Sequence, residues 1–336
     1  MIKEAISKII AGENLSQPEM TEVMNQIMSG EATDAQIGAF LVALRLKGET
    51  VEEISGAATV MREKATKVTT KHKVVMDTCG TGGDHSGTFN ISTTAAFVVA
   101  GAGICVAKHG NRSVSSACGS ADVLKALGVN IDVPPDKVGR CLDEVGMGFL
   151  FAPSLHGAMK YAIGPRREIG VRSIFNVLGP LTNPAGARHQ LIGVYSPGLT
   201  TVLAQVLNRL GSERAMIVHG SDGLDEVTTT GDSKLSILVD KEVWDGHVSP
   251  SEYGIPLVSP KDLLGGTPDE NAEITLGVLR GEKGPKRDVV VLNAAAAISV
   301  AALAHNFERG MQIAEESIDS GAALGKLEAL REASNS

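Results

Sequence analysis

A glycine-rich stretch in the first third of the chain has the sequence Asp77-Thr78-Cys79-Gly80-Thr81-Gly82-Gly83-Asp84-His85-Ser86-Gly87-Thr88-Phe89-Asn90-Ile91-Ser92-Thr93. It follows the apolar run Val74–Met76 and precedes an alanine- and valine-rich run, Thr94–Ala102. This order predicts a strand, a glycine-rich loop and the start of a helix. Glycine lets a loop turn tightly and approach a ligand, and the N–H groups at a helix N-terminus favour an anion. The sequence therefore predicts a phosphate-binding loop.

The glycine spacing separates this loop from two common nucleotide-binding loops. Its pattern is Gly80-x-Gly82-Gly83 followed by an acid, whereas a Walker loop ends in Gly-Lys-Ser/Thr and a dinucleotide loop has Gly-x-Gly-x-x-Gly. An ordinary strand-to-helix turn is the alternative interpretation. Four glycines followed by the polar side chains of Asn90–Thr93 favour a ligand-binding loop instead.

The composition of the chain bounds its class. Its 336 residues predict two domains, and 43% hydrophobic and 21% charged residues are typical of a soluble globular protein. The formal net charge of −8 argues against general binding of nucleic acid or of an anionic membrane, so we expect neither as a partner. Any positive site for an anionic ligand must then be local.

Cysteine usage and the start of the chain predict a cytoplasmic protein. The four cysteines form neither a Cys-x-x-Cys pair nor a zinc-type spacing, so free thiols in a reducing compartment are expected. The N-terminus does not resemble a signal peptide. The longest weakly polar run, Val289–Ala304, falls short of a membrane span, and we expect Asn293 within it to be buried with a polar partner.

The first 65 residues have the apolar spacing of helices throughout. Three helix starts are predicted by the capping-box pairs Ser16-x-x-Glu19, Thr33-x-x-Gln36 and Thr50-x-x-Glu53. The methionines of this region are interpreted as core residues rather than a cofactor site. We therefore expect a small all-helical domain over residues 1–70.

From Val74 onward, short β-rich runs alternate with helical segments. The predicted strands are Val74–Met76, Ile104–Ala107, Phe149–Phe151, Leu191–Tyr195, Ala215–His219 and Leu235–Val239. Such alternation predicts a mostly parallel sheet covered by helices, in an α/β domain over residues 71–336. Beyond Trp244 the pattern indicates only helices.

Polar loops follow three of the predicted strands, where ligands bind in parallel sheets. The first is the glycine loop. The second is Lys108-His109-Gly110-Asn111-Arg112-Ser113-Val114-Ser115-Ser116, followed by Ser120, and the third contains Asp225-Glu226. Adjacent carboxylates suit a hard divalent cation that bridges protein and phosphate. Each loop alone is compatible with a solvated surface loop, but three at one edge of one sheet favour a shared site.

Three arginines, Arg166, Arg167 and Arg172, concentrate positive charge in an acidic protein. Arginine suits bidentate recognition of a carboxylate, although exposed arginines on a helix are the alternative interpretation. His156, judged by itself, is predicted to be structural.

Several motifs agree in order and spacing with one known family. They are Gly80–Asp84, Asn90–Thr93, Lys108–Arg112, the segment Phe175-Asn176-Val177-Leu178-Gly179-Pro180-Leu181-Thr182-Asn183-Pro184, and Asp225-Glu226. In these motifs the chain resembles the anthranilate phosphoribosyltransferase family, and the resemblance extends from the first helix to the last. It implies a nucleoside phosphorylase/phosphoribosyltransferase-like fold, with a helical piece near residues 165–185 that returns to the small domain. It also implies a homodimer formed through the helical domains.

The resemblance implies an enzyme of tryptophan biosynthesis. The reaction would transfer phosphoribose from 5-phosphoribosyl diphosphate to the amine of anthranilate and release diphosphate. The implied donor-binding residues are Gly80, Gly83, Asp84, Thr88, Asn90, Ile91, Ser92, Thr93, Lys108, His109, Gly110, Asn111, Arg112, Ser113, Val114, Ser115, Ser116 and Ser120. The implied anthranilate-binding residues are Gly80, Asn111 and Arg166, in a pocket shaped by His109, His156 and Gly179. Ser92, Asp225 and Glu226 would bind Mg²⁺, with two ions expected.

One departure from the family is visible at Ala117, where some members carry lysine. It affects the expected number of cations around the phosphates. An arylamine is neutral at pH 7, so attack needs no strong base beforehand, and the sequence shows no obvious acid–base pair. We therefore expect catalysis by positioning and charge stabilisation through Lys108, Asn111 and Arg166.

Three other classes are alternatives. A pyrimidine nucleoside phosphorylase is the nearest, but its loop is expected to contain Lys-His-Ser and its chain to be longer, with an extra C-terminal domain. A non-catalytic nucleotide sensor is disfavoured by the intact carboxylate pair and Arg166. A dinucleotide oxidoreductase is disfavoured by the glycine spacing.

Overall fold

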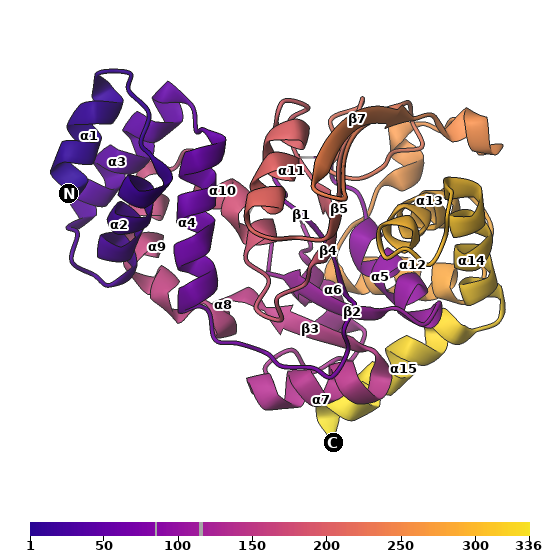
Figure 1. Cartoon of the computed structure of the whole chain (residues 1–336). Helices are drawn as coiled ribbons and strands as arrows, with labels where there is room; N and C mark the ends of the chain where they lie inside the picture. Colours follow the sequence, from indigo (N-terminus) through magenta and orange to yellow (C-terminus); the bar gives the residue numbers. More distant parts are fainter. Residues whose placement is uncertain (85, 114–116) are drawn as a thin grey trace.

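The computed structural model describes residues 1–84, 86–113 and 117–336, and it consists of a helical lobe and a larger α/β lobe (Figure 1). The helical lobe is built from α1 (Ile2–Ile10), α2 (Gln17–Met28), α3 (Asp34–Lys47) and α4 (Val51–Lys64). The three predicted capping boxes all form at the starts of α2, α3 and α4. The methionines of α2 are buried, which confirms that they belong to the core.

A later segment of the chain packs against the helical lobe. Helix α9 (Lys160–Ile169) contacts α2 and α3, and α10 (Phe175–Leu178) contacts α4. The chain reaches α9 through α8 (Ala152–Leu155) and the short η1 (Gly157–Met159), and it leaves α10 through η2 (Gly179–Leu181). Figure 1 shows α9 and α10 beside the N-terminal helices. Residues from the middle of the sequence therefore lie between the two lobes.

The α/β lobe contains one seven-stranded sheet with the order β3-β2-β1-β4-β5-β6-β7. The strands are β1 (Val75–Gly80), β2 (Cys105–Gly110), β3 (Met147–Phe151), β4 (His189–Gly193), β5 (Arg214–Gly220), β6 (Ser233–Val239) and β7 (Glu242–Val248). The five strands from β3 to β5 are parallel, and β6 and β7 are added antiparallel at one edge. The prediction of a mostly parallel central sheet is confirmed.

The prediction of helices alone beyond Trp244 is wrong, because Glu242–Val248 forms the edge strand β7. Val239 pairs with Glu242, so the hairpin turn consists of Asp240 and Lys241, which have φ angles of 51° and 65°. Tight hairpin turns of this kind usually contain glycine or asparagine, and this turn contains neither. The strand is mostly exposed, so its sequence lacks the apolar alternation of a buried strand.

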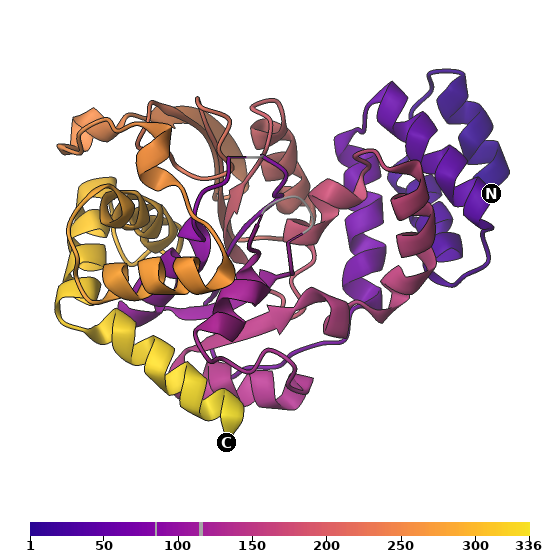
Figure 2. The ribbon, with the colours of Figure 1, turned by 180° about the vertical axis from the view of Figure 1, so that it is seen from behind.

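Helices cover both faces of the sheet. On one face, α5 (Ile91–Gly101) and α13 (Pro285–Val300) pack against the central strands, and further helices surround them (Figure 2). On the other face lie α7 (Pro135–Val145) and α11 (Leu199–Arg209), and α11 also contacts α4 of the helical lobe. The remaining elements are α6 (Ser120–Ala126), η3 (Pro250–Tyr253), η4 (Pro260–Leu263), α12 (Pro268–Leu279), α14 (Phe307–Asp319) and α15 (Ala322–Asn335).

The core joins the two lobes. One buried apolar cluster contains Met20 and Phe40 of the helical lobe together with Leu203 of α11 and Ile192 of β4. All four cysteines are buried, and in the described part of the chain none of them forms a disulfide. In the part of the chain that the structure describes, no helix has both the length and the apolar character needed to cross a bilayer.

Candidate active site

Three carboxylates gather at the carboxyl ends of the central strands. Ligand oxygens of Asp84, Asp225 and Glu226 all lie within 4.8 Å of one another. Burial and the nearby charge of Asp84 raise the pKa of Asp225 to about 7. Burial and repulsion from Asp225 and Asp84 raise the pKa of Glu226 well above its ordinary value. We call these three side chains the acid cluster.

The acid cluster fits a hard divalent cation. Carboxylate oxygens are the ligands that Mg²⁺ prefers, and a buried group of like charges is stabilised when a cation neutralises it. The Ser92 backbone at the start of α5 also hydrogen-bonds Glu226. Of the predicted ligands, Asp225 and Glu226 belong to the acid cluster, and Ser92 contacts it through its backbone. The structure adds Asp84, which the sequence had assigned to the donor.

Glycine is required at the ends of β1 and β4 because the Asp225 loop crosses them. A Cβ atom at Gly80 would lie 2.4 Å from Oδ2 of Asp225, and one at Gly193 would lie 1.4 Å from its carbonyl oxygen. The Gly82 N–H donates to the same Oδ2 at 2.7 Å. Gly80 therefore makes room for a carboxylate of the site, in addition to any ligand.

The glycine loop leads into the first turn of α5. Gly82, Gly83 and Gly87 have φ angles of 64°, 75° and 67°, which non-glycine residues rarely adopt. Thr88 forms an isolated bridge with Leu264. The side chain of Asn90, the residue before α5, does not cap the helix. The predicted helix therefore begins at Ile91, and the Ser92 backbone in its first turn contacts Glu226.

Lys108, His109 and Gly110 do not lie in a loop, as the sequence suggested, but form the end of strand β2. The Lys108 side chain is 2% exposed, and its Nζ donates to the carbonyl oxygen of Thr78. Burial lowers the pKa of Lys108, while the charges of Asp77, Glu226 and Asp225 oppose that shift. A polar end of a strand is stable here because its polar groups have buried partners.

Asp77 supplies one of those partners. Its Oδ1 accepts from the His109 N–H at 3.0 Å, and its Oδ2 accepts from Nδ2 of Asn183 at 2.8 Å. The same Asn183 nitrogen donates to the carbonyl oxygen of Ala107 at 2.8 Å. Burial raises the pKa of Asp77, and the Lys108 charge opposes it. This network fixes the ends of β1 and β2 beneath the site.

Asp122 organises the loop between β2 and α6. Its Oδ2 accepts from the N–H groups of Ser113 at 3.1 Å and Gly119 at 2.9 Å, and its Oδ1 pairs with Arg112 at 3.3 Å. Ser120 Oγ donates to the carbonyl oxygen of Asn111 at 3.2 Å. The predicted residues Val114, Ser115 and Ser116 lie outside the described residues. Asp122 was not among the predicted site residues.

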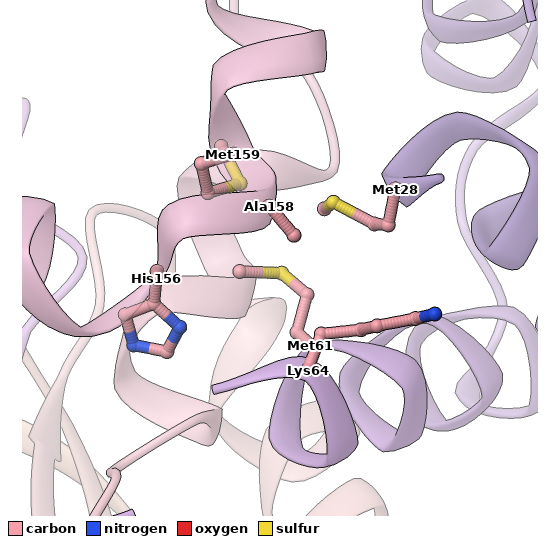
Figure 3. Close-up of a pocket in the computed structure, with 6 residues that line it drawn as sticks. All are labelled: Met28, Met61, Lys64, His156, Ala158 and Met159. Carbon is pink, nitrogen blue, oxygen red and sulfur yellow. The ribbon is translucent and has the colours of Figure 1, made fainter. Parts of the chain in front are cut away.

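Two histidines meet between the lobes. Nε2 of His109 and Nε2 of His156 are 3.2 Å apart, and both side chains are buried. Burial lowers the pKa of His109 to about 3 and that of His156 to about 4. His109 also donates a hydrogen bond to the Gly179 backbone, so its other ring nitrogen accepts a hydrogen bond from the His156 N–H when both rings are neutral. Figure 3 shows the His156 ring beside Met61, in a small cavity that Met28 and Met159 also line.

The three arginines have different surroundings. Arg166 is half-buried on α9, and its guanidinium lies 5.0 Å from the centre of the Phe175 ring. Burial lowers the pKa of Arg166, and no charged group among the described residues offsets that effect. Arg167 is exposed, whereas Arg172 donates to the carbonyl oxygen of Gly83. Of the three, Arg166 is the cation best placed to receive an anionic ligand.

Two asparagines from the C-terminal third brace the site. Asn271 of α12 donates to Oδ1 of Asn90 at 3.0 Å. Asn293 of α13 accepts from the Val227 N–H at 3.0 Å and donates to the Val227 carbonyl at 2.8 Å, directly after Glu226. The expectation that Asn293 is buried with a partner is confirmed. The only sequence signal for Asn293 was its position in the otherwise apolar part of α13, which has Ser299 as its other polar residue, and Asn271 gave none.

The site combines an acid cluster that suits a cation, a glycine loop that leads into the start of α5, and an arginine whose charge no other described residue offsets. Fold and site together define a two-domain enzyme that binds a phosphorylated substrate with a metal ion and a second, anionic substrate. Models of the glycosyl transferase family match both domains: the helical bundle domain over residues 3–65 and the a/b domain over residues 72–324.

Similar proteins and solved structures identify one family within this class of enzymes. The anthranilate phosphoribosyltransferase of Moorella thermoacetica is 62% identical over 98% of this chain and 97% of its own length, and that of Acetivibrio thermocellus is 56% identical over 100% and 97%. The Thermus thermophilus anthranilate phosphoribosyltransferase structure superposes with a TM-score of 0.94 at 42% identity, covering 99% of both chains. The chain belongs to the anthranilate phosphoribosyltransferase family. A Saccharomyces cerevisiae member with PRPP and Mg is also similar, with a TM-score of 0.90 at 29% identity over 99% and 98% of the two chains.

Proposed function

We propose that this protein transfers the 5-phosphoribosyl group of 5-phospho-α-D-ribose 1-diphosphate to the amine of anthranilate, yielding N-(5-phosphoribosyl)anthranilate and diphosphate in tryptophan biosynthesis. One observation carries the proposal most strongly. The acid cluster contacts the glycine loop through the hydrogen bond from the Gly82 N–H to Asp225. A diphosphate bound to a metal ion at the acid cluster would therefore lie beside the backbone N–H groups of the loop. Similar structures of the yeast enzyme contain PRPP and Mg or 4-fluoroanthranilate, which supports the choice of substrates.

The donor would be held at the carboxyl ends of β1 and β2. The proposed contacts are the glycine loop with Gly80, Gly83, Asp84 and Thr88, the helix start Asn90–Thr93, the segment Lys108–Ser116, and Ser120. Backbone N–H groups at a helix start suit phosphate oxygens. Lys108 is buried, so we assign it an electrostatic role from beneath the site.

The metal ligands would be Asp225, Glu226 and Ser92, joined by Asp84, and we propose two Mg²⁺ ions. Magnesium supplies charge neutralisation for the departing diphosphate. The acid cluster would hold it, and the Gly82 N–H keeps the Asp225 carboxylate in place. Neighbouring Gly80 and Gly193 leave the space that this loop occupies.

Anthranilate would lie between the lobes. Arg166 would pair with its carboxylate, Asn111 and Gly80 would contact the ring and amine, and the neutral pair His109 and His156 with Gly179 would shape the pocket. The amine is neutral at pH 7, so these residues need only orient it toward the ribose. We propose that positioning and charge stabilisation account for catalysis.

We propose a homodimer formed through the helical lobe. Helices α1 and α3 carry exposed apolar side chains, with Ile10 at 73%, Val42 at 37% and Leu46 at 82% exposure, and α9 adds Ile163 at 46%. Because α3 contacts both α1 and α9, these side chains belong to neighbouring helices. Exposed apolar groups on adjoining helices support an interface with a second copy. A cytoplasmic location is also proposed, supported by the four cysteines that the described structure leaves outside disulfides.

A direct assay tests the proposed function. The purified protein is incubated with anthranilate, phosphoribosyl diphosphate and Mg²⁺ while anthranilate fluorescence is followed. The proposal predicts a fluorescence loss that requires all three components. Stable fluorescence would refute it, and phosphorolysis of thymidine or uridine would instead identify a pyrimidine nucleoside phosphorylase.

A further inference from the structure

Arg172 connects the segment that carries Arg166 to the glycine loop. Its Nη2 donates to the carbonyl oxygen of Gly83, and its guanidinium lies 4.3 Å from the centre of the Tyr195 ring. Arg172 follows the left-handed Gly170, whose N–H closes the end of α9 on the Arg166 carbonyl oxygen at 3.3 Å. Arg166 and Arg172 are therefore held on one short turn.

Tyr195 is itself fixed to the same loop. Its N–H donates to Oγ1 of Thr81 at 3.1 Å, and the Thr81 N–H donates to the Gly193 carbonyl oxygen at 2.9 Å. The contacts thus form a closed ring that runs from Thr81 through Tyr195 and Arg172 to Gly83. We call this ring the loop clamp.

The loop clamp restrains the glycine loop in addition to the hydrogen bond from the Gly82 N–H to Asp225. Gly82 and Gly83 have positive φ angles of 64° and 75°, and glycine loses the most conformational freedom when it is ordered. A loop that is ordered before binding spares the ligand that entropic cost. An arginine hydrogen bond to a carbonyl with its guanidinium stacked on an aromatic ring is a strong way to impose such order.

We propose that Arg172 is a positioning residue that couples binding of the anionic acceptor to binding of the phosphorylated donor. This inference rests on the proposed function, because it requires both substrates. An acceptor carboxylate on Arg166 orders the turn after α9, and Arg172 on that turn holds Gly83 in the conformation that the donor binds. The coupling is reciprocal, so each ligand raises the affinity for the other.

Calorimetry of donor binding tests the inference. The dissociation constant of phosphoribosyl diphosphate with Mg²⁺ is measured with and without saturating salicylate, which keeps the acceptor carboxylate but lacks the amine. We expect salicylate to tighten donor binding about fivefold or more in the wild type. We define the coupling ratio as the donor Kd without salicylate divided by the donor Kd with salicylate. In Arg172→Ala the coupling ratio should fall to about one. The donor Kd without salicylate should rise about tenfold, which corresponds to about 1.4 kcal/mol.

Matched variants separate coupling from a merely structural link. Arg167→Ala removes an exposed arginine of the same segment and should keep the wild-type ratio. Arg172→Lys retains a hydrogen-bond donor for Gly83, so its coupling ratio should lie between those of Arg172→Ala and the wild type. Tyr195→Ala removes the ring beside Arg172 and should have a lower coupling ratio than the wild type. These two variants carry the test if Arg172→Ala does not fold.

Two results would overturn the inference. One is a wild-type ratio near one, and the other is a folded Arg172→Ala protein that keeps the wild-type ratio. Turnover of anthranilate by the wild type is measured in parallel. Turnover without coupling refutes this inference alone, whereas the absence of both turnover and donor binding refutes the proposed function as well.

Discussion

Burial sets the charge of the individual residues around the site. His109 and His156 are kept neutral, Asp225 and Glu226 hold protons more tightly than usual, and Arg166 is a half-buried cation without a counter-charge among the described residues. A cation would offset the repulsion within the acid cluster, and an anion would offset the buried charge of Arg166. Two predictions follow from single residues.

Arg166→Ala should weaken the acceptor much more than the donor. A hydrogen bond between a charged arginine and a carboxylate contributes about 1.5–3 kcal/mol, so KM for anthranilate should rise about tenfold to a hundredfold. Steady-state kinetics with each substrate varied in turn measures this, with Arg167→Ala as the control. Equal increases in both KM values would contradict the assigned role.

The histidine pair should make stability depend on pH. The folded pKa values of about 3 and about 4 lie below the unfolded value of about 6.5. Between pH 7 and pH 5 the unfolded chain therefore binds protons that the folded protein refuses, so stability falls as the pH falls. At pH 5 each imidazole contributes a loss of about 2 kcal/mol.

Urea unfolding at pH 7 and pH 5 checks this dependence. Between pH 7 and pH 5, the free energy of unfolding should fall by about 2 kcal/mol less in His109→Gln than in the wild type. The exposed His72→Gln serves as the control and should behave as the wild type does. An unchanged pH dependence in His109→Gln would show that the pair is not held neutral.

At the scale of secondary-structure elements, the site depends on how the strands end. Asp225 passes over the ends of β1 and β4, and this crossing is possible only because both strands finish in glycine. The capping boxes and the strand-then-polar-loop pattern are local signals, so the sequence predicted the starts of α2, α3 and α4 and six of the seven strands in the described part of the chain, whereas it placed the end of β2 in a loop. It missed β7, whose turn and exposed face lack such signals.

The unpredicted part of the site consists of long-range contacts. Asn183 reaches Asp77 across 106 residues, and Asn271 reaches Asn90 across 181. No local pattern records such a pairing. Lys108 was placed in a loop because polar residues usually end a strand, but here a buried network allows the strand to continue.

Gly193→Ala should disrupt the acid cluster. The added Cβ atom would lie 1.4 Å from the Asp225 carbonyl oxygen, so the loop must move away from β4. We expect a stability loss of about 1–3 kcal/mol and a higher Mg²⁺ requirement. Gly198→Ala, where a Cβ atom meets nothing within 4 Å, is the matched control. Thermal unfolding and magnesium titration of activity measure both effects, and wild-type behaviour of Gly193→Ala would contradict the crossing.

At the scale of the whole molecule, the helical lobe has two surfaces with different tasks. One surface packs against α11 and the α9–α10 segment and thereby forms part of the space between the lobes. Another carries the exposed apolar side chains of α1, α3 and α9. Under the proposed function, the first surface supports the site and the second forms the proposed interface with another copy.

Leu46→Glu should prevent assembly. A charge placed at this exposed position would have to be buried in the proposed interface, which is costly. Light scattering should give the wild type twice the chain mass of 34.9 kDa and the variant that of one chain. Leu257→Glu changes an exposed leucine of the other lobe and should leave the mass unchanged. A monomeric wild type would contradict the dimer.

The central claim is that the acid cluster binds the magnesium that makes diphosphate departure possible. Its most direct test is the initial rate of anthranilate consumption as a function of Mg²⁺ concentration, with saturating phosphoribosyl diphosphate. The double variant Asp225→Asn, Glu226→Gln should need far more Mg²⁺ and turn over at least about a hundredfold more slowly, while Glu213→Gln, on an exposed carboxylate away from the site, should match the wild type. An unchanged Mg²⁺ dependence in the double variant would contradict the claim.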